Sequence, residues 1–305
     1  MDDFQKENSF ISAVLYLHDS EKQVLEFFDK IKNTFDNFFR NYELIVVDDV
    51  CTDKSVQILK KWAEDIDKPI TILHMSLYHG REEAMNAGID AAIGDFVYEF
   101  DSMQLPYDVK LIYEAYQHVI AGNDIVCVCP THVRRSSSFF YRIFNANSKS
   151  IYQLQTDAFR IVTRRALNRV HMLTSFMPYR KASYAASGLK MGYIVFEGEV
   201  QSKEKNRISL AIDSLALYTN AGYRISIGIT FFMTIVAFAE LAYTVVIYCI
   251  GKPIAGWTTT MLVISFGFLG LFFILSILIK YMSLNLDMIF HKQKYLIESI
   301  ERIQK

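Results

Sequence analysis

The sequence lacks the patterns that would mark a metal-thiolate, redox or nucleic-acid-binding protein. Its four cysteines, Cys51, Cys127, Cys129 and Cys249, form neither a CxxC pair nor a Cys/His spacing, so we interpret them as packing residues. Positive charge is not in excess, because 32 Lys and Arg residues face 33 Asp and Glu residues and the formal net charge is −1. A nucleic-acid-binding protein would concentrate basic residues on one face, so no nucleic-acid partner is expected.

The first residues also lack the features of a secretory signal. Asp2, Asp3, Lys6 and Glu7 stand where a signal peptide would have an apolar run after a basic start. We therefore expect the N-terminal part to begin and stay in the cytosol, where thiols are kept reduced. No internal repeat or low-complexity segment follows.

Two long runs near the end of the chain are nearly free of charge, Ile225 to Ile250 and Thr258 to Ile279. Each is longer than the roughly 20 apolar residues that a helix needs to cross a bilayer. Basic residues flank both outer sides of the pair: Lys203, Lys205, Arg207 and Arg224 before it, and Lys280, His291, Lys292 and Lys294 after it. The turn Gly251 to Trp257 holds only Lys252.

This distribution predicts a transmembrane hairpin with its turn outside and both termini in the cytoplasm, in a multi-pass protein of the inner or plasma membrane. Glu240 lies inside the first run. An acid is costly at the bilayer centre, so we expect Glu240 to face a partner helix or to approach the outer interface. Counted from Ile225, it falls in the outer half, which favours an oligomer contact over a catalytic role.

Before the hairpin, strand-like and helix-like segments alternate. The predicted strands are short runs rich in Val, Ile, Phe and Tyr: Phe10 to Leu17, Glu43 to Asp49, Ile70 to Met75, Asp95 to Asp101 and Asp124 to Cys129. The predicted helices have apolar residues recurring at three and four: Glu21 to Phe39, Asp53 to Ile66, Arg81 to Ala92 and Val109 to Ala121. The alternation indicates an α/β fold with a mostly parallel sheet, covered by helices on both faces.

After Pro130 the alternation ends. The segment Arg134 to Gln153 mixes basic and aromatic residues as an interfacial amphipathic helix does, although a solvated helix that covers the sheet has the same pattern. The segment Arg207 to Asn220 alternates apolar and polar positions just before the first span, which suits a helix along the membrane surface.

Aspartates stand at the ends of predicted strands, where a doubly wound sheet binds its ligands. Asp48 and Asp49 follow Leu44 to Val47, and Asp101 follows Phe96 to Phe100. A carboxylate there can bond a nucleobase or ribose, or hold a divalent ion that bridges a diphosphate. A single one, such as Asp48, is also explained as a helix N-cap. His18 and His79 stand at strand ends too, either near donor phosphate or as hydrogen-bonding loop residues.

In order along the chain, these motifs resemble the family 2 glycosyltransferases, and within them the polyisoprenyl-phosphate branch, which includes dolichol-phosphate mannose synthase and undecaprenyl-phosphate glucosyltransferases. Tyr42 to Ser55 is similar to the family's strand ending in D-D-G-S-x-D, and His79 to Asp95 to its G-x-x-x-A-x-N-x-G-x-x-x-A-x-G-D stretch. Asp101 to Pro106 stands in the place of D-x-D-L-Q-x-P-P. Arg134 to Asn145, Phe159 to Arg165 and Lys294 to Glu298 resemble the branch's R-x-S-x-x-F-Y-R-x-x-N, F-R-L-x-x-R-R and closing P-x-Y-I-x-E motifs.

The resemblance implies a GT-A fold of Rossmann type and inverting transfer of a sugar from a UDP- or GDP-sugar to a polyprenyl (undecaprenyl or dolichyl) phosphate. It implies a membrane enzyme that acts on the cytoplasmic leaflet in cell-surface polysaccharide or glycan modification, as a homo-oligomer, with Mg²⁺ or Mn²⁺. The expected parts are a GT-A domain over 1–205, an interfacial amphipathic helix over 206–222, two transmembrane helices over 223–281 and a cytosolic tail helix over 282–305.

The resemblance also assigns roles to residues. The catalytic positions are Asp101 and Gln104, with Asp101 as the metal ligand; the nucleotide-sugar-binding positions are Asp19, Asp49, Asp53, His79, Asp101 and Lys203; the acceptor-phosphate positions are Arg135, Arg142 and Arg160. The acceptor phosphate monoester is largely ionised near neutral pH, its second pKa being about 6, so no side chain needs to remove its proton. The site must instead stabilise charge on the leaving diphosphate.

The chain departs from the family pattern where a metal would bind. The second acid of D-x-D falls on Met103 or, with the gap placed earlier, on Ser102, and the glycine of D-D-G-S is Val50. The loss of one carboxylate weakens Mg²⁺ or Mn²⁺ binding. Two functions therefore stay open: an active transferase with a weakened metal site, and a catalytically impaired membrane-bound protein with a regulatory or assembly role.

Overall fold

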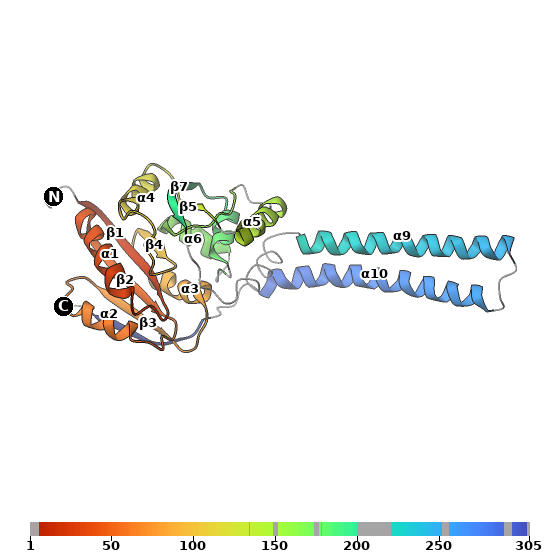
Figure 1. Ribbon diagram of the computed structural model, residues 1–305, viewed down its shortest axis with the longest axis horizontal. Helices are drawn as coiled ribbons and strands as arrows, with labels where there is room; N and C mark the ends of the chain where they lie inside the picture. The colour runs from red at the N-terminus through yellow and green to blue at the C-terminus, as the bar shows by residue number, and fades with distance from the viewer. Residues whose placement is uncertain are drawn as a thin grey trace. The chain divides into compact units, whose positions relative to one another are not determined.

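A computed structural model describes residues 6–133, 135–148, 152–173, 177, 179–199, 221–251, 256–289 and 295–303. The chain forms two compact units. The first joins Met1–Leu210 to His291–Lys305, and the second is Ala211–Phe290. The C-terminal residues thus belong to the same unit as the N-terminal ones, and in Figure 1 the blue strand β8 lies beside the orange strand β3.

The first unit is built on one mixed sheet. Its strand order is β7-β5-β6-β4-β1-β2-β3-β8. The strands are β1 (Glu7–Leu17), β2 (Phe39–Asp48), β3 (Ile70–Met75), β4 (Phe96–Phe100), β5 (Ile125–His132), β6 (Phe159–Thr163), β7 (Met191–Glu199) and β8 (Ile297–Ile303). Pairing is parallel between β1 and β2, β1 and β4, β2 and β3, and β5 and β7, whereas β6 and β8 run antiparallel to their neighbours. The predicted, mostly parallel α/β sheet is confirmed.

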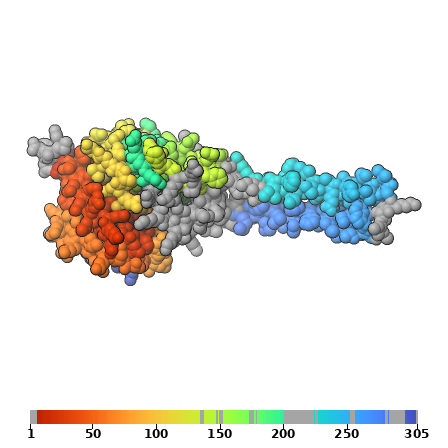
Figure 2. Space-filling model, in the orientation of Figure 1, coloured from red at the N-terminus to blue at the C-terminus, as the bar shows by residue number. Residues whose placement is uncertain are grey.

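Helices cover both faces of this sheet. They are α1 (Val24–Phe38), α2 (Ser55–Ala63), α3 (Arg81–Ala91), α4 (Lys110–Ile120), α5 (Arg135–Asn147), α6 (Arg164–Leu173) and α7 (Arg180–Ala186). Side chains of α1, α2 and α4 pack with Leu44 and Val46 in one apolar cluster, and side chains of α3, α6 and α7 pack with Ile45 and Val47 in another. The alternation follows from the two-residue period of a strand. Figure 2 shows the elements of the first half of the chain, red to yellow, closely packed.

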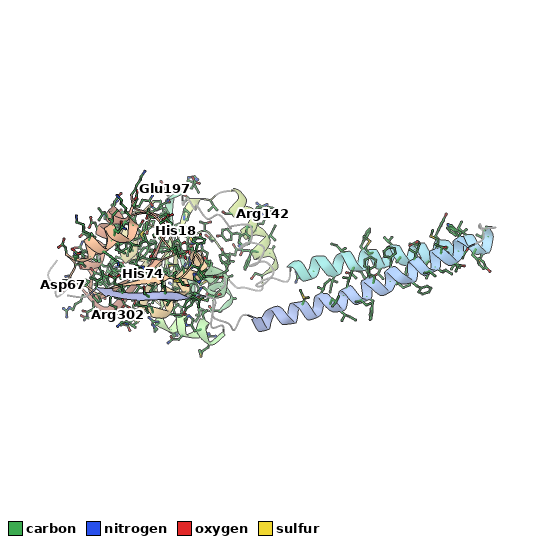
Figure 3. The ribbon with its side chains drawn as sticks, turned by 90° about the horizontal axis from the view of Figure 1, so that it is seen from below. His18, Asp67, His74, Arg142, Glu197 and Arg302 are labelled. Atoms are coloured by element: carbon green, nitrogen blue, oxygen red, sulfur yellow. The ribbon has the colours of Figure 1, made fainter. Side chains whose placement is uncertain are left out.

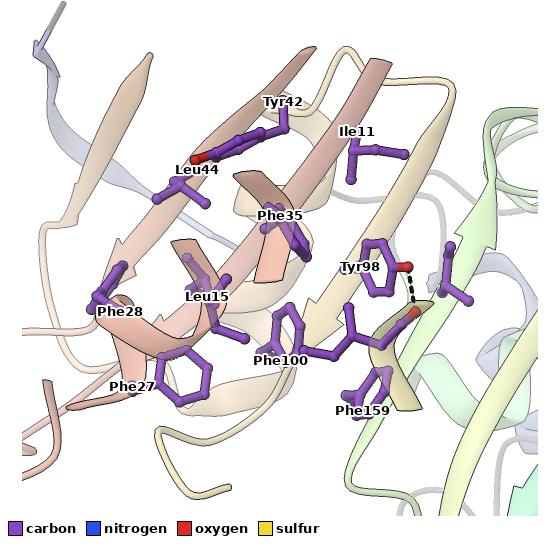
Figure 4. Close-up of a cluster of buried hydrophobic side chains, with 14 of the residues drawn as sticks. Ile11, Leu15, Phe27, Phe28, Phe35, Tyr42, Leu44, Tyr98, Phe100 and Phe159 are labelled. Atoms are coloured by element: carbon purple, nitrogen blue, oxygen red, sulfur yellow. Dashed lines mark hydrogen bonds between the residues drawn. The ribbon is translucent and has the colours of Figure 1, made fainter. Parts of the chain in front are cut away.

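Aromatic rings dominate the first of these clusters (Figure 4). Phe27 of α1 meets Phe100 of β4 edge to face at 5.7 Å between ring centroids, and Phe100 stacks on Phe159 of β6 at 5.4 Å. The hydroxyl of Tyr98 donates a hydrogen bond of 2.7 Å to the carbonyl oxygen of Ile112 in α4. These contacts fix the position of the end of β4. The candidate site begins at the next residue, Asp101.

The second unit is a hairpin of two long helices, α9 (Ala221–Ile250) and α10 (Trp257–Ile289). The stretches Ile227–Ile250 and Trp257–Ile279 are long and apolar enough to cross a membrane. Among their described side chains most apolar ones are exposed, as lipid-facing residues are, while Ala237, Thr244 and Ser265 are buried. Glu240 is half-buried on the same side of α9 as Ala237 and Thr244.

The C-terminal tail corrects one sequence expectation. A helix was expected over 282–305, but α10 continues only to Ile289 and Ile297–Ile303 is strand β8. The spacing of Ile297, Ile300 and Ile303 suits a helix, yet the edge of β3 offers unpaired backbone groups that a strand can satisfy and a helix cannot. Most of the helix expected over 206–222 lies outside the described residues.

Candidate active site

Three parallel strands end side by side at the carboxyl edge of the sheet. The pairing register sets Leu17 of β1 opposite Asp48 of β2, and Leu15 of β1 opposite Phe100 of β4. The residues that follow these strands are therefore neighbours, and they include Asp19, Asp49 and Asp101 as the sequence predicted. Ligands of doubly wound sheets bind at this edge.

Asp49 is fully buried and serves the loop before α3. One carboxylate oxygen accepts a hydrogen bond of 2.8 Å from the backbone N–H of His79. The other accepts two hydrogen bonds of 2.9 Å each, one from the backbone N–H of Gly80 and one from the hydroxyl of Tyr16. Burial, and then the charge of Asp49, raise the pKa of Tyr16, so this hydroxyl keeps its proton and donates. About three of the four acceptor positions of Asp49 are used. In this arrangement Asp49 shapes the site instead of facing a nucleotide as expected.

His79 is likewise engaged by backbone groups. Its Nδ1 lies 2.6 Å from the carbonyl oxygen of Leu77, and its Nε2 lies 3.1 Å from the backbone nitrogen of Leu296. A neutral ring with the proton on Nδ1 satisfies both contacts. These two contacts agree with the alternative that His79 is a hydrogen-bonding loop residue, and its contact with donor phosphate stays a prediction. His18 is also bonded to backbone, with Nδ1 2.8 Å from the carbonyl oxygen of Asp49.

Asp19 and Asp53 are the strand-end acids that stay partly open to solvent. Asp19 accepts the backbone N–H of Thr52 at 2.7 Å and that of Asp53 at 3.2 Å, and these bonds lower its pKa. Asp53 accepts the N–H of Ser55 at 2.9 Å at the start of α2 and that of Glu21 at 3.0 Å. Together they join the loop after β1 to the loop after β2.

A candidate metal-binding group lies in these same loops. One ligand atom from each of Asp19, Cys51 and Asp53 lies within 4.8 Å of the others. Burial raises the pKa of the Cys51 thiol, and nearby Asp48 raises it further, so this thiol is protonated at neutral pH and is a poor ligand. Two carboxylates remain, which is the number that Mg²⁺ or Mn²⁺ commonly takes from a protein when substrate phosphates complete the shell.

Asp101 is held between two buried arginines. Its Oδ2 accepts Nη2 of Arg160 at 2.7 Å, and its Oδ1 accepts Nη2 of Arg180 at 2.6 Å. The side chain of Asp101 is 10% exposed. Burial alone would raise the pKa of Asp101, but the charges of Arg180 and Arg160 outweigh it and hold the pKa well below its usual range.

The same arginines reach a second layer of buried acids. Arg180 also donates to Glu99 Oε2 at 2.6 Å and to Glu82 Oε2 at 3.0 Å, while Arg160 donates to Asp157 Oδ2 at 2.9 Å. Burial raises the pKa of Glu99 in spite of both arginines. The result is a buried ion network that ties α3, β4, β6 and α7 to Asp101.

This network decides how Asp101 and Arg160 fit their expected roles. Each oxygen of Asp101 accepts one guanidinium N–H, which uses about two of the four acceptor positions of this carboxylate. Arg160 is 1% exposed, so it supports Asp101 and does not present its charge to a lipid phosphate as expected. Gln104 is half-buried three residues beyond Asp101, and its backbone N–H donates to Ser102 Oγ at 3.2 Å.

The remaining predicted residues belong to α5 or fall outside the described part. Arg142 is exposed on α5 (Figure 3), as is Phe139 at 64%, whereas Phe144 is buried against Phe140 at 5.9 Å between ring centroids. Phe144 therefore packs in the domain core. The side chain of Arg135 and the whole of Lys203 lie outside the described residues.

Residues 12–187 match the family model described as "Glycosyl transferase family 2". The chain belongs to this family. The match begins within β1 and ends just after α7. It includes four residues of the site described above: Asp49, Asp101, Arg160 and Arg180.

Curated relatives extend the similarity over the whole chain. An "Uncharacterized glycosyltransferase YkcC" of Bacillus subtilis is 23% identical over 85% of this chain and 84% of its own length. An "Undecaprenyl-phosphate 4-deoxy-4-formamido-L-arabinose transferase" of Edwardsiella ictaluri is 22% identical over 99% of this chain and 97% of its own length. Relatives with this second name support the polyprenyl-phosphate branch of the family.

Solved structures of GT-A glycosyltransferases share the fold. A mannosyltransferase, PcManGT, from Pyrobaculum calidifontis, solved with GDP-Man and Mn²⁺, has a TM-score of 0.51 and 16% identity over 70% of this chain. This chain spans 62% of that structure's length. A mannosyl-3-phosphoglycerate synthase from Rubrobacter xylanophilus has a TM-score of 0.51 and 15% identity over 68% of this chain and 73% of its own.

Arg180, which contacts three acids of this site, was not predicted from the sequence. Arg180 makes three ion pairs with Glu82, Glu99 and Asp101, yet it lies beyond the motifs that carried the resemblance. Its sequence signal is slight: a basic pair, Arg180 and Lys181, in an otherwise small and aromatic segment. Its acidic partners come from 79 to 98 positions earlier, so no local pattern joins them.

Proposed function

We propose that this chain transfers a sugar from a UDP- or GDP-sugar to a polyprenyl phosphate at the cytoplasmic leaflet of the inner or plasma membrane. Membership of glycosyl transferase family 2 supports the reaction class, and the names of the full-length relatives support a polyprenyl-phosphate acceptor. The two apolar helices α9 and α10 support a membrane anchor. The observation that carries the proposal is Asp101, fixed by two arginines at the end of β4, beside the open acids of the first two loops.

In this proposal a phosphate oxygen of the lipid attacks the anomeric carbon and the nucleoside diphosphate leaves from the opposite side, with inversion. The attacking phosphate is already ionised near neutral pH, so the reaction needs no general base from the protein. Asp19 and Asp53 line the edge where the nucleotide lies, and the network around Asp101 orients the sugar end.

A divalent ion, Mg²⁺ or Mn²⁺, stabilises negative charge on the leaving diphosphate when bound. The solvent-facing carboxylates of Asp19 and Asp53 would hold it, together with an acceptor position of Asp101 that Arg160 and Arg180 do not use. With few protein ligands we expect weak metal binding. Activity should require millimolar rather than low micromolar Mn²⁺, and saturation in the low micromolar range would contradict the weakened site.

The acceptor is proposed to meet the exposed side of α5. Arg142 offers a fork of N–H donors to the lipid phosphate, and the exposed ring of Phe139 suits the acyl boundary. Replacing Arg135 and Arg142 by Ala should raise the KM for polyprenyl phosphate and leave nucleotide binding unchanged. The control is Arg169→Ala on the exposed side of α6. An unchanged acceptor KM would remove α5 from this role.

The test of the reaction is a membrane assay with a panel of labelled nucleotide sugars and polyprenyl phosphate, with and without Mn²⁺. Asp101→Asn should abolish transfer, because the amide keeps the shape but not the charge held by Arg160 and Arg180. Asp67→Asn, in the exposed loop before β3 (Figure 3), is the matched control. Full activity of Asp101→Asn would remove Asp101 from the site.

One observation favours the second candidate, an impaired protein that regulates or assembles with other glycan enzymes. Neither Ser102 nor Met103 supplies a second carboxylate next to Asp101. Nucleotide binding without transfer to any acceptor in the same panel would decide for this function. A homo-oligomer formed through α9, with half-buried Glu240 at its contact, is proposed for either function.

A further inference from the structure

The C-terminal segment Tyr295–Ile303 reaches both aspartates of the Asp48–Asp49 pair, although the membrane hairpin separates it from them in sequence. Strand β8 pairs with β3 over the register from Ile70 opposite Ile303 to Met75 opposite Ile297. This position closes the edge of the sheet next to β3, and β3 in turn lies beside β2, the strand that ends at Asp48.

The first connection runs through His74 of β3 (labelled in Figure 3). Its Nδ1 lies 2.8 Å from Asp48 Oδ2, and its Nε2 lies 3.4 Å from Glu301 Oε2 of β8. Asp48 in turn accepts the backbone N–H of Cys51 at 2.9 Å, which fixes the turn after β2. Lys60 of α2 pairs with the same Glu301 oxygen at 2.5 Å.

The second connection runs through His79. Its Nε2 accepts the backbone N–H of Leu296, and its own backbone N–H is donated to Asp49. The carbonyl oxygen of Leu296 accepts two hydrogen bonds from Ser76, one from its backbone N–H at 3.1 Å and one from its hydroxyl at 3.2 Å. The loop before α3 is thus bonded to Asp49 on one side and to the C-terminal segment on the other.

A third contact anchors the segment to α3. The hydroxyl of Tyr295 donates to Asp90 Oδ2, and the Tyr295 ring is buried in the apolar cluster of α3, α6 and α7. Tyr295, Leu296 and Glu298 stand where the closing P-x-Y-I-x-E motif of the sequence falls. Tyr295 and Leu296, at the start of this motif, therefore attach the C-terminal segment to α3 and to the loop before it.

We infer that His74 and His79 are positioning residues that bond the C-terminal segment to the turn of Asp48 and Asp49, so that the donor edge has its binding shape only while β8 is docked. The inference rests on the proposed function for the identity of the ligand, a nucleoside diphosphate sugar. His74 and His79 act through the aspartates and backbone they hold. The chain that returns from the hairpin therefore completes the site that precedes the hairpin in sequence.

Two substitutions loosen the segment at points away from the donor edge. Tyr295→Phe removes the hydroxyl that reaches Asp90, and Glu301→Gln removes the charge beside His74 and Lys60. His79→Phe removes both ring hydrogen bonds at the centre. Each variant should raise the donor KM about threefold to tenfold, the cost of one or two hydrogen bonds, with kcat and the acceptor KM unchanged. His118→Phe near the end of α4 is the control.

A purely structural role for the segment would lower the thermal unfolding midpoint in these variants and leave the donor KM as in the wild type. That result would overturn the inference. Additive effects of Tyr295→Phe and His79→Phe would overturn it too, because groups that act through one docked segment must be coupled.

Hydrogen exchange keeps this test separate from the proposed function. In the full-length protein in detergent, Tyr295→Phe and Glu301→Gln should speed amide exchange over residues 48–53 and 76–80, and leave β5 (Ile125–His132) protected as in the wild type. This readout needs no transfer activity. Unchanged exchange at 48–53 would reject the inference even if transfer is observed, whereas changed exchange with no transfer to any acceptor would reject only the proposed function.

Discussion

Arg180 donates a hydrogen bond of 2.6 Å from Nη2 to Oδ1 of Asp101, which lies 79 positions earlier in the chain. The side chain of Arg180 is fully buried and that of Asp101 is 10% exposed. Because a lone buried charge is far less stable than a paired one, each of these residues requires the other. The pair therefore holds the start of α7 against the residue that follows β4.

Replacement of Arg180 should damage both stability and transfer. Arg180→Met leaves Glu82, Glu99 and Asp101 with one guanidinium fewer, so we expect a loss of about 3–5 kcal/mol in unfolding free energy. Arg180→Lys keeps the charge but cannot reach three acids at once with one ammonium group. It should fold better than the Met variant and still lose most activity. Thermal unfolding measures the effect on stability, and initial rates measure the effect on transfer. Full activity of Arg180→Lys would show that the branched guanidinium group of Arg180 is not required.

Stability should fall in acid because of Asp101 and Asp157. For both groups burial alone raises the pKa, but the neighbouring charges (Arg180 and Arg160 for Asp101, Arg160 and Lys181 for Asp157) hold it below the usual value. A depressed pKa contributes stability that is present above the unfolded value, about 3.9 for Asp, and is lost as pH falls through the folded value. We expect the contribution of these pairs to be constant from about pH 5 upward and to decline below about pH 4.

The matched variant for this pH dependence is Asp157→Asn. It should be less stable than the wild type at pH 7. The difference between the two unfolding midpoints should shrink toward pH 3, because Asp157 of the unfolded wild-type chain takes up a proton in this range before the folded pair does. A difference that stays constant down to pH 3 would show that Asp157 contributes by shape and not by charge.

The sequence predicted the β1–β5 core because each strand and helix there has its own apolar period. It did not predict β8, since Ile297–Ile303 becomes a strand only through pairing with β3. It predicted Asp49 and Asp101 as site residues from their positions at strand ends. It did not predict that Asp49 bonds the loop before α3 or that Arg180 holds Asp101, because these contacts join residues that are distant in sequence and depend on tertiary packing.

Val50 occupies a position that favours glycine. Its φ is +56°, in the left-handed region that a β-branched residue rarely adopts. The strain costs on the order of 1–2 kcal/mol. Val50→Gly should therefore raise the unfolding free energy by about 1 kcal/mol after the entropy of glycine is counted. Val50→Ala keeps the Cβ and should gain little, and equal stabilisation by both variants would point to the lost Val methyl groups and not to φ.

Two glycines of the His79 to Asp95 motif allow close packing of α3 and its following turn. A Cβ at Gly88 would stand 2.4 Å from Val14 Cγ1, and one at Gly94 would stand 2.6 Å from the backbone nitrogen of Ser12. Side-chain atoms can shift but backbone of a central strand cannot, so Gly94→Ala should be more destabilising than Gly88→Ala. Overpacking costs about 1–3 kcal/mol, and we expect Gly94→Ala at or above the top of this range. The reverse order in urea unfolding would contradict this account.

The turn between α9 and α10 should lie on the side of the membrane opposite the cytoplasm. Basic residues flank the outer ends of the hairpin and only Lys252 lies within Gly251 to Trp257, so the positive-inside rule predicts that both termini lie in the cytoplasm. The donor edge then faces the cytosol, where nucleotide sugars and the lipid phosphate can meet. Since Cys249 is an exposed native thiol next to the turn, the test uses a Cys249→Ser background.

In that background a cysteine at Gly251 should react with a membrane-impermeant maleimide in intact cells. A cysteine in place of Asp67, in the exposed loop before β3, should react only after the membrane is opened. The opposite labelling pattern would place the domain outside. It would also remove the geometric basis for an acceptor that meets α5 on the cytoplasmic surface, because the charged phosphate of the lipid and the donor would then lie on opposite sides of a barrier that neither crosses unaided.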